Sequence, residues 1–257
     1  MSRIFVCGDL HGRSEDMKKL TSKKWKMQHE LNKNDFLIQL GDFGLVWYDI
    51  TNPKFKEDMY YRNWLSDKNY TTLFLDGNHE NHDLLNNLEI ESKFGGKVGL
   101  VNTKYGNIYH LKRGEIYTIN NKKFLIIGGA ETQFKGVECK EWWKNEILSN
   151  EDKKNILDNL KKHDFKVDFV LSHNCPLSVG NEMASKKFGG GWSFSEKEFE
   201  KYFFKSNDSV AIFMEFLLKE GLSAKEWHFG HWHEDVKLKI NEITYYCHYN
   251  NIPLELI

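Results

Sequence analysis

Residues 4–12 are IFVCGDLHG, so an apolar run passes directly into a glycine-bounded loop that carries Asp9 and His11. The same arrangement recurs in residues 36–42, FLIQLGD, and in residues 73–79, LFLDGNH. Short apolar runs that end at glycine are typical of buried strands. Helical patterns separate the three runs, and this β-α-β-α-β order predicts an α/β fold with a parallel sheet and helices on its faces.

Two helices are expected between these strands. The first is expected to begin at Ser14, a capping residue, with Glu15 and Asp16 favourably placed on the helix dipole. Its apolar residues at helical spacing are Met17, Leu20, Met27 and Leu31. The second helix is expected within residues 54–68.

The second half of the chain is richer in predicted strands. Residues 115–119 and 122–127 flank Asn120-Asn121, a pair that favours a tight hairpin turn. Asn150 is expected to cap a helix that carries Ile156, Leu157 and Leu160. The other predicted elements are strands at 167–171 and 227–229, a helix at 208–220 ended by Gly221, and an antiparallel strand pair at 236–240 and 244–249.

The composition indicates one domain spanning residues 1–257. Hydrophobic residues make up 40% of the chain, which is enough for a sizeable core and argues against disorder. The net charge of −1 gives no general attraction for nucleic acid or for an anionic membrane. The cysteines are scattered, no stretch is apolar enough to span a bilayer, and the N-terminus has no apolar signal region. These features predict a reduced, cytoplasmic protein.

Polar clusters follow five of the predicted strands. Because ligands bind beyond the carboxyl ends of strands in open α/β sheets, we expect the five loops to converge on one rim. The i, i+2 spacing within the Asp9–His11 and His231–His233 pairs predicts two side chains on the same side of an extended segment. The candidate metal ligands are Asp9, His11, Asp42, Asn78, His173, His231 and His233.

The candidate ligands combine carboxylate and amide oxygens with imidazole nitrogens and contain no thiolate. This set suits manganese, with iron, zinc or nickel as alternatives, and it suits calcium or a closed structural zinc site poorly. We expect two divalent ions, since a carboxylate commonly bridges two metals that lie roughly 3.5–4 Å apart.

The five loops together resemble the calcineurin-like metallophosphoesterase superfamily. The pattern of that superfamily is GDxHG, GD, GNH followed by Glu or Asp, a lone His, and GHxH, and residues 8–233 match every block in order. The resemblance implies a four-layer α/β/β/α sandwich. It also implies one metal on Asp9, His11 and His233, a second on Asn78, His173 and His231, and Asp42 as the bridge.

The activity implied by the resemblance is hydrolysis of a phosphoric ester. A hydroxide between the two metals would attack phosphorus, and His79, which the resemblance places on the substrate, would protonate the leaving oxygen. Asn78 is also a candidate substrate contact. Arg13, one of only four arginines, is the candidate for a phosphate contact.

The second block departs from the protein phosphatases of the superfamily, which continue it as GDxVDRG. Leu45 stands where they have an Asp that orients the catalytic His, and Val46 stands where they have a phosphate-binding Arg. The absence of this Asp and this Arg, together with the scarcity of arginine, favours a small diester or a nucleotide as the substrate over a phosphoprotein. The aromatic residues that could receive a base are Trp47, Tyr48, Trp142, Trp143 and Trp192.

Alternatives stay open at this point. Besides a diesterase, the sequence allows a monoesterase, a protein Ser/Thr phosphatase, or a non-catalytic scaffold on the same fold.

Residues 136–146 are interpreted as a substrate-facing loop or a cap over the sheet edge, and residues 188–192 as a lid or a connector. The remaining histidines are expected to be packed or surface residues: His29, His82, His110, His163, His228 and His248.

Overall fold

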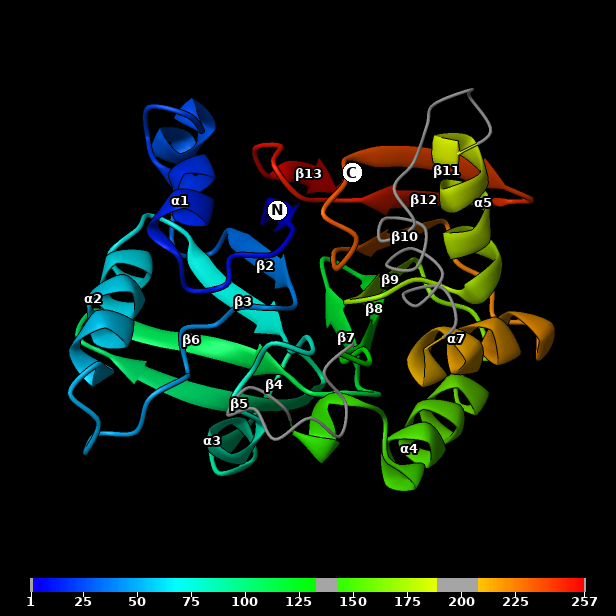
Figure 1. The fold of residues 1–257 in the computed structure, drawn as a ribbon, viewed down its shortest axis with the longest axis horizontal. Coiled ribbons are helices and arrows are strands. Elements are labelled where there is room, and N and C mark those ends of the chain that lie inside the picture. The colour runs from blue at the N-terminus through cyan, green and yellow to red at the C-terminus, as the bar shows by residue number, and fades with distance from the viewer. Residues whose placement is uncertain (1, 133–142, 189–207, 257) are drawn as a thin grey trace.

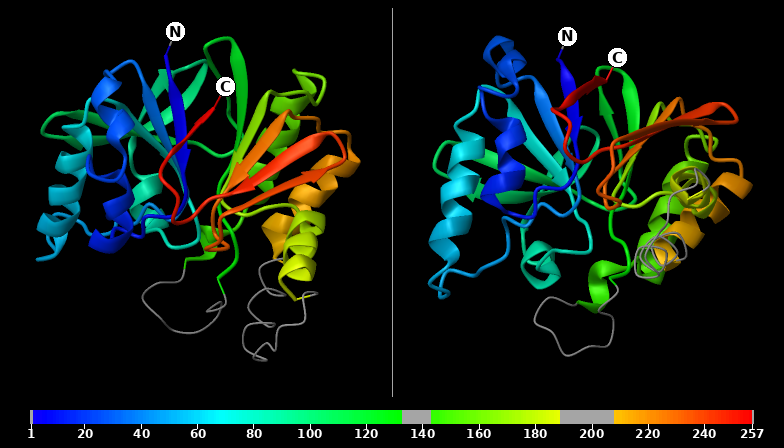
Figure 2. Two further views of the ribbon diagram at one scale, coloured as in Figure 1. Left: turned by 90° about the horizontal axis from the view of Figure 1, so that it is seen from above. Right: turned by 45° about the horizontal axis from the view of Figure 1, so that its top comes forward.

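The computed structural model describes residues 2–132, 143–188 and 208–256 of the chain. These residues form two β-sheets that pack face to face, with helices on the outer face of each sheet (Figure 1). Figure 2 shows the two helical layers separated by both sheets. The predicted four-layer α/β/β/α sandwich is therefore confirmed.

The first sheet has seven strands in the order β13-β1-β2-β3-β6-β5-β4. Its parallel centre consists of β1 (Ile4–Cys7), β2 (Phe36–Leu40), β3 (Thr71–Leu75) and β6 (Gly106–Leu111). The strands that pair antiparallel are β5 (Gly96–Thr103), β4 (Glu89–Lys93) and β13 (Leu254–Leu256). The first three strands agree with the expectation, whereas β4, β5, β6 and β13 were not predicted.

The second sheet has six strands in the order β11-β12-β10-β9-β8-β7. They are β7 (Ile116–Ile119), β8 (Lys122–Ile127), β9 (Phe169–Ser172), β10 (Glu226–Phe229), β11 (Val236–Ile240) and β12 (Ile243–Cys247). The predicted hairpin turn is confirmed, because Asn120 and Asn121 both have positive φ, as a type I′ turn requires.

The strand alternation explains the layers. Ile4 and Val6 of β1 face the second sheet, whereas Phe5 and Cys7 pack beneath the helices of the first. The helices over the first sheet are α1 (Ser14–Met17), α2 (Phe55–Ser66) and α3 (His82–Asn86). The helices over the second are α4 (Asn150–Lys161), α5 (Leu177–Phe188) and α7 (Ser209–Lys219).

Three expectations about helices need correction. Residues 14–31 form the single turn α1 followed by two 3-10 segments, Lys18–Leu20 and Lys26–Glu30, and not one helix. Ser14 is the first residue of α1 and makes no capping bond, since the N-cap position belongs to Arg13. Ser149, and not Asn150, caps α4.

Among the described residues, no helix has the length and apolar character needed to cross a bilayer.

Candidate metal centre

Seven side chains predicted as metal ligands meet where the two sheets adjoin. Loops after β1, β2 and β3 supply Asp9, His11, Asp42 and Asn78, and loops after β9 and β10 supply His173, His231 and His233. The contacts between the two sets cross from one sheet to the other. The structure thus brings the predicted residues together on one rim.

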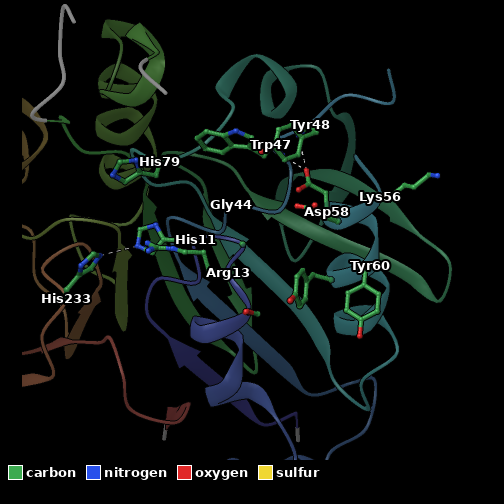
Figure 3. A pocket seen from close by; sticks show the side chains of 14 residues that line it. His11, Arg13, Gly44, Trp47, Tyr48, Lys56, Asp58, Tyr60, His79 and His233 are labelled. Atoms are coloured by element: carbon green, nitrogen blue, oxygen red, sulfur yellow. Dashed lines mark hydrogen bonds between the residues drawn. The ribbon is translucent and has the colours of Figure 1, made fainter. Parts of the chain in front are cut away.

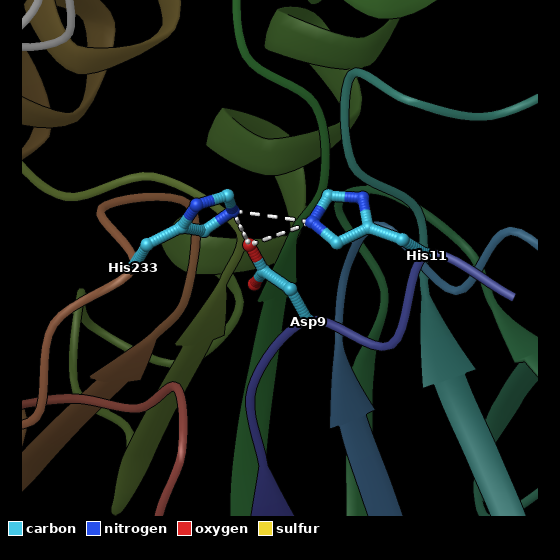
Figure 4. A group of neighbouring side chains, drawn as sticks. All are labelled: Asp9, His11 and His233. Carbon is cyan, nitrogen blue, oxygen red and sulfur yellow. Dashed lines mark hydrogen bonds and ion pairs between the residues drawn. The ribbon is translucent and has the colours of Figure 1, made fainter. Parts of the chain in front are cut away.

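Asp9, His11 and His233 form the first group (Figure 4). Asp9 Oδ2 lies 3.1 Å from His233 Nε2 and 3.7 Å from His11 Nε2, and the two imidazole nitrogens are 3.1 Å apart. Asp9 is fully buried, and His233 stacks on Tyr249 with ring centroids 4.5 Å apart. One carboxylate oxygen and two ring nitrogens therefore point at a common centre, as the donors of a divalent ion do.

Asp9, Asp42 and His173 form the second group. His173 Nε2 lies 3.2 Å from Asp42 Oδ1 and 3.1 Å from Asn78 Oδ1. The other oxygen of Asp42, Oδ2, lies 3.7 Å from Nδ1 of His11 in the first group. Asp42 thus contacts one histidine of each group through its two carboxylate oxygens, while Asp9 is the residue common to both groups.

His173 is fixed in an orientation suited to a ligand. Its Nδ1 lies 2.9 Å from the carbonyl oxygen of Leu40, so Nδ1 carries the proton that is donated to that oxygen. Nε2 then faces Oδ1 of Asp42 and Oδ1 of Asn78, where a bound metal ion would take the place of the Nε2 proton. Metal-binding histidines are commonly held in this way by a carbonyl behind the ring.

The charges of the cluster favour a bound cation. Burial alone would raise the pKa of Asp9, but contact with His233 and the charge of His173 lower that pKa to about 2. Burial likewise opposes the charge on Asp42, yet His173 holds the Asp42 pKa well below its usual range. Burial would lower the pKa of His173, but Asp42 raises it to about 9. Two buried carboxylates are therefore ionised here and need positive charge beside them.

The backbone at the centre differs from the expectation of extended pairs. His11, Asp42, His231 and His233 all have positive φ, between 48° and 64°. Left-handed backbone at residues other than glycine is uncommon and concentrates at functional sites. These loops are tight turns. The prediction that extended segments bring the Asp9–His11 and His231–His233 side chains together was therefore wrong.

Glycine is required beside the candidate ligands. A Cβ atom on Gly41 would collide with the ring of His173, and Gly41 also has a φ of 86°. A Cβ on Gly77 would collide with Oδ1 of Asp42. The two loops approach each other closely because neither carries a side chain at these points.

The loop of residues 43–48 is anchored by residues from two other segments, α2 and the loop after β3. Glu80 accepts the N–H groups of Phe43 (2.6 Å) and Gly44 (3.1 Å). Asp58 Oδ2 on α2 accepts those of Trp47 (2.8 Å) and Tyr48 (2.9 Å). The remaining anchors are Arg62, which donates to the Leu45 carbonyl oxygen, and Asn81, which donates to that of Trp47.

Leu45 and Val46 are core residues in this loop, 1% and 4% exposed. These two positions therefore supply no charged group to orient His79 or to bind a phosphate.

His79 and Arg13 line a cleft of about 900 Å³ beside the first group. The backbone N–H of His79 donates to Asp42 Oδ1 over 2.8 Å, and its half-buried ring lies edge-on to that of His11, with centroids 5.7 Å apart. The side chain of Arg13 is 64% exposed, and its Nε lies 3.4 Å from Asp16. His79 is thus held at the centre, whereas Arg13 is held only by a surface ion pair.

Sequence reasoning did not find Lys19 or Tyr249. Buried Lys19 donates from Nζ to the carbonyl oxygens of Asp9 (2.6 Å) and Tyr249, and Tyr249 stacks on His233. Tyr249 follows the end of β12, whereas the sequence analysis placed it inside the predicted strand 244–249, so the strand-end rule did not apply to it. Lys19 carries no comparable local signal.

Trp143 lies in the described part of the chain and contacts Trp47, with ring centroids 5.4 Å apart. Its Nε1 donates to Asp83 over 3.1 Å. Residues 136–142, including Trp142, and residues 189–192, including Trp192, lie outside the described residues, so the interpretations of these two loops stay untested.

A family model described as calcineurin-like phosphoesterase matches residues 2–235. The chain is similar to GAP50, the anchor in the inner membrane complex of Plasmodium, with 12% identity, 96% of this chain and 70% of that chain covered, and a TM-score of 0.47. It is also similar to phosphopantetheinyl hydrolase (PptH) from Mycobacterium tuberculosis, with 13% identity, 100% and 96% covered, and a TM-score of 0.42. A search of curated proteins gave no match.

Proposed function

Because the chain belongs to the calcineurin-like phosphoesterase family, we propose that it hydrolyses a phosphoric ester with the help of two divalent metal ions. The observation that carries this proposal is the pair of ligand groups that share Asp9. The donor set fits manganese, with iron, zinc or nickel as alternatives. Asp9, His11 and His233 would hold one ion, and Asn78, His173 and His231 the other, with Asp42 between them.

Bound ions of this kind activate water and neutralise charge on the phosphoryl oxygens. The roles left to the side chains follow from their positions. His79 faces the cleft beside His11, where it would donate a proton to the leaving oxygen. Asn78 and Arg13 are the candidate contacts to the phosphoryl group, Asn78 from the buried centre and Arg13 from the cleft wall.

A small diester or a nucleotide is the substrate class that we propose, in preference to a phosphoprotein. A phosphate monoester dianion usually requires several cationic side chains. Among the residues that line the cleft, only Arg13 and Lys56 carry permanent positive charge. A diester carries less negative charge at the phosphoryl group, so this lining suits it better.

The test is a paired assay on protein reconstituted with Mn²⁺. Hydrolysis of bis(nitrophenyl) phosphate is compared with that of nitrophenyl phosphate, in the wild type and in His79→Ala. We expect metal-dependent turnover with a preference for the diester, and a fall in kcat of about 10²–10⁴-fold in His79→Ala at unchanged metal content. His29→Ala, which removes an exposed histidine, is the matched control and should keep full activity.

The outcomes separate the alternatives. Preference for the monoester would contradict the proposed substrate class, and faster turnover of a phosphopeptide would point to a protein phosphatase. Absence of metal-dependent turnover on all three substrates would contradict the enzymatic function and favour the scaffold.

A further inference from the structure

The cleft beside the metal centre extends well beyond the groups that would handle a phosphoryl group. Figure 3 shows His11, His79 and His233 at one end and Lys56 and Tyr60 at the other. Its volume of about 900 Å³ is near the upper end of the range typical of small-molecule sites. A phosphate alone would leave most of this space unused.

The part of the cleft that lies away from the metal centre, called the distal part below, is lined by Trp47, Tyr48, Tyr60, Tyr61, Lys56 and Glu57. Its aromatic side chains come from two elements. Trp47 and Tyr48 come from the loop after β2, and Tyr60 and Tyr61 come from α2. Tyr60 is 64% exposed although it is a large aromatic residue. The rings of Trp47, Tyr48 and Tyr61 are partly buried, so the four rings offer flat surfaces on two elements of one cleft on which a planar ligand can stack.

The loop that carries Trp47 and Tyr48 is ordered before any ligand arrives. Both N–H groups are held by Asp58, the carbonyl oxygen of Trp47 is held by Asn81, and that of Leu45 by Arg62. A ligand that stacks here does not have to order this backbone, which lowers the entropic cost of binding.

The edges of the distal part are polar. Lys56 and Glu57 from α2 line it together with the aromatic residues, so a donor and an acceptor lie within the same wall. Both residues are exposed to water, so a plain hydrocarbon ring would gain nothing from them, whereas a heterocycle with ring nitrogens and amino or keto groups can bond to them.

We propose that the distal part of the cleft, defined by Trp47, Tyr48, Tyr60, Tyr61, Lys56 and Glu57, is a subsite for a nucleobase. The inference rests on the proposed function, because it assigns the phosphoryl group of the same ligand to the metal centre. The substrate is then a nucleotide ester whose base lies between the Trp47–Tyr48 loop and α2.

The test measures binding separately from turnover. Calorimetry on the Mn²⁺-loaded protein compares AMP, ribose 5-phosphate, phenyl phosphate and inorganic phosphate, with phosphate release measured in the same samples. We expect AMP to bind at least about tenfold more tightly than ribose 5-phosphate, as stacking of one base allows. Tyr60→Ala and Trp47→Ala should each weaken AMP binding about tenfold and leave the affinity for inorganic phosphate unchanged, and Trp47→Phe should restore most of the loss.

Tyr105→Ala is the matched control, because Tyr105 is also an exposed tyrosine, 48% exposed, and does not line the cleft. Its AMP affinity should equal that of the wild type. Equal affinities for AMP and ribose 5-phosphate, or an unchanged AMP affinity in Tyr60→Ala, would overturn the subsite. Phenyl phosphate binding as tightly as AMP would overturn the assignment to a nucleobase.

Different results would contradict the nucleobase subsite and the esterase function. Turnover of simple diesters without any preference for AMP would leave the esterase intact and remove the subsite. AMP binding that depends on Tyr60, in a protein that hydrolyses none of the esters, would leave the subsite intact and remove the esterase.

Discussion

His82 and His110 are buried histidines beside a buried ion pair. Asp76 Oδ2 accepts from Nε of Arg113 at 2.7 Å, and Asp76 Oδ1 lies 3.2 Å from His110 Nε2. Both histidines line a cavity of about 250 Å³ with Arg113. Burial lowers the pKa of His82 to about 3 and that of His110 to about 4, so both rings are neutral in the folded protein near neutral pH.

These pKa values predict how stability depends on pH. In the unfolded chain the two histidines titrate near pH 6.5, so the stability that their neutral forms provide is fully present above that pH. It is lost as pH falls from 6.5 toward the folded pKa values, at about 1.4 kcal/mol per pH unit for each histidine. Urea denaturation between pH 7 and pH 5 measures this slope, which should be shallower by that amount in His110→Gln.

His29→Gln is the control for this measurement, because His29 is exposed, and its slope should match the wild type. Parallel slopes for the wild type and His110→Gln would show that His110 is not held neutral by burial, contrary to the prediction.

Single residues of the candidate centre could be predicted because each lies in a short local pattern. A polar residue beside a glycine at the end of an apolar run is visible without the fold, and this is how Asp9, Asp42 and Asn78 were found. Asp58 and Arg62 could not be found in this way. They bond to loop residues that lie 10 to 17 positions away in the sequence, and only the packing of α2 against that loop reveals their role.

At the scale of elements, α4 begins with a capping residue that differs from the one expected from the sequence. Ser149 accepts the N–H of Asp152 at 3.0 Å, and the Asp152 side chain accepts the N–H of Ser149 at 2.9 Å, which is a capping box. Ser149→Ala should therefore lower the free energy of unfolding by about 1 kcal/mol. Chemical denaturation measures the change.

Asn150→Ala is the matched comparison for Ser149→Ala. Asn150 was the cap expected from the sequence, but it is the first helical residue, so its replacement by alanine should cost much less. A larger loss in Asn150→Ala than in Ser149→Ala would contradict the observed cap. The two residues are adjacent and both are good caps, which explains why the sequence alone did not distinguish them.

Strands were predictable where both of their faces are buried. All residues of β1 and β2 are buried; β1 is a continuous apolar run, and the apolar run of β2 contains one polar residue, Gln39. β4 is exposed along most of its length and contains Glu89, Glu91 and Lys93, so nothing in its composition favours a strand. It forms because β5 offers a free edge, a tertiary effect that local patterns do not record.

At the scale of the whole molecule, the candidate metal centre joins the two sheets. Asp9, His11, Asp42 and Asn78 belong to loops of the first sheet, and the three other histidines belong to loops of the second. Ions bound there would link the sheets at the rim, in addition to the apolar contacts between their inner faces. Metal binding should therefore stabilise the sandwich as a unit, beyond its effect on the loops.

Removal of the metal should consequently lower the melting temperature. An ion at about 100 times its Kd stabilises by about 2.7 kcal/mol, which for a chain of this size corresponds to roughly 5–10 °C. Calorimetric melts with Mn²⁺ and after chelation measure the shift, and elemental analysis should give two ions per chain. Asp42→Asn should lower both the melting temperature in Mn²⁺ and the number of bound ions, because its carboxylate contacts a histidine of each group, whereas Asp67→Asn, at an exposed aspartate, should change neither. Equal melting temperatures with and without metal would mean that packing alone holds the two sets of loops together. One ion per chain would contradict the two-metal centre, although an ion on Asp9, His11 and His233 would still link the sheets, because these three ligands come from loops of both.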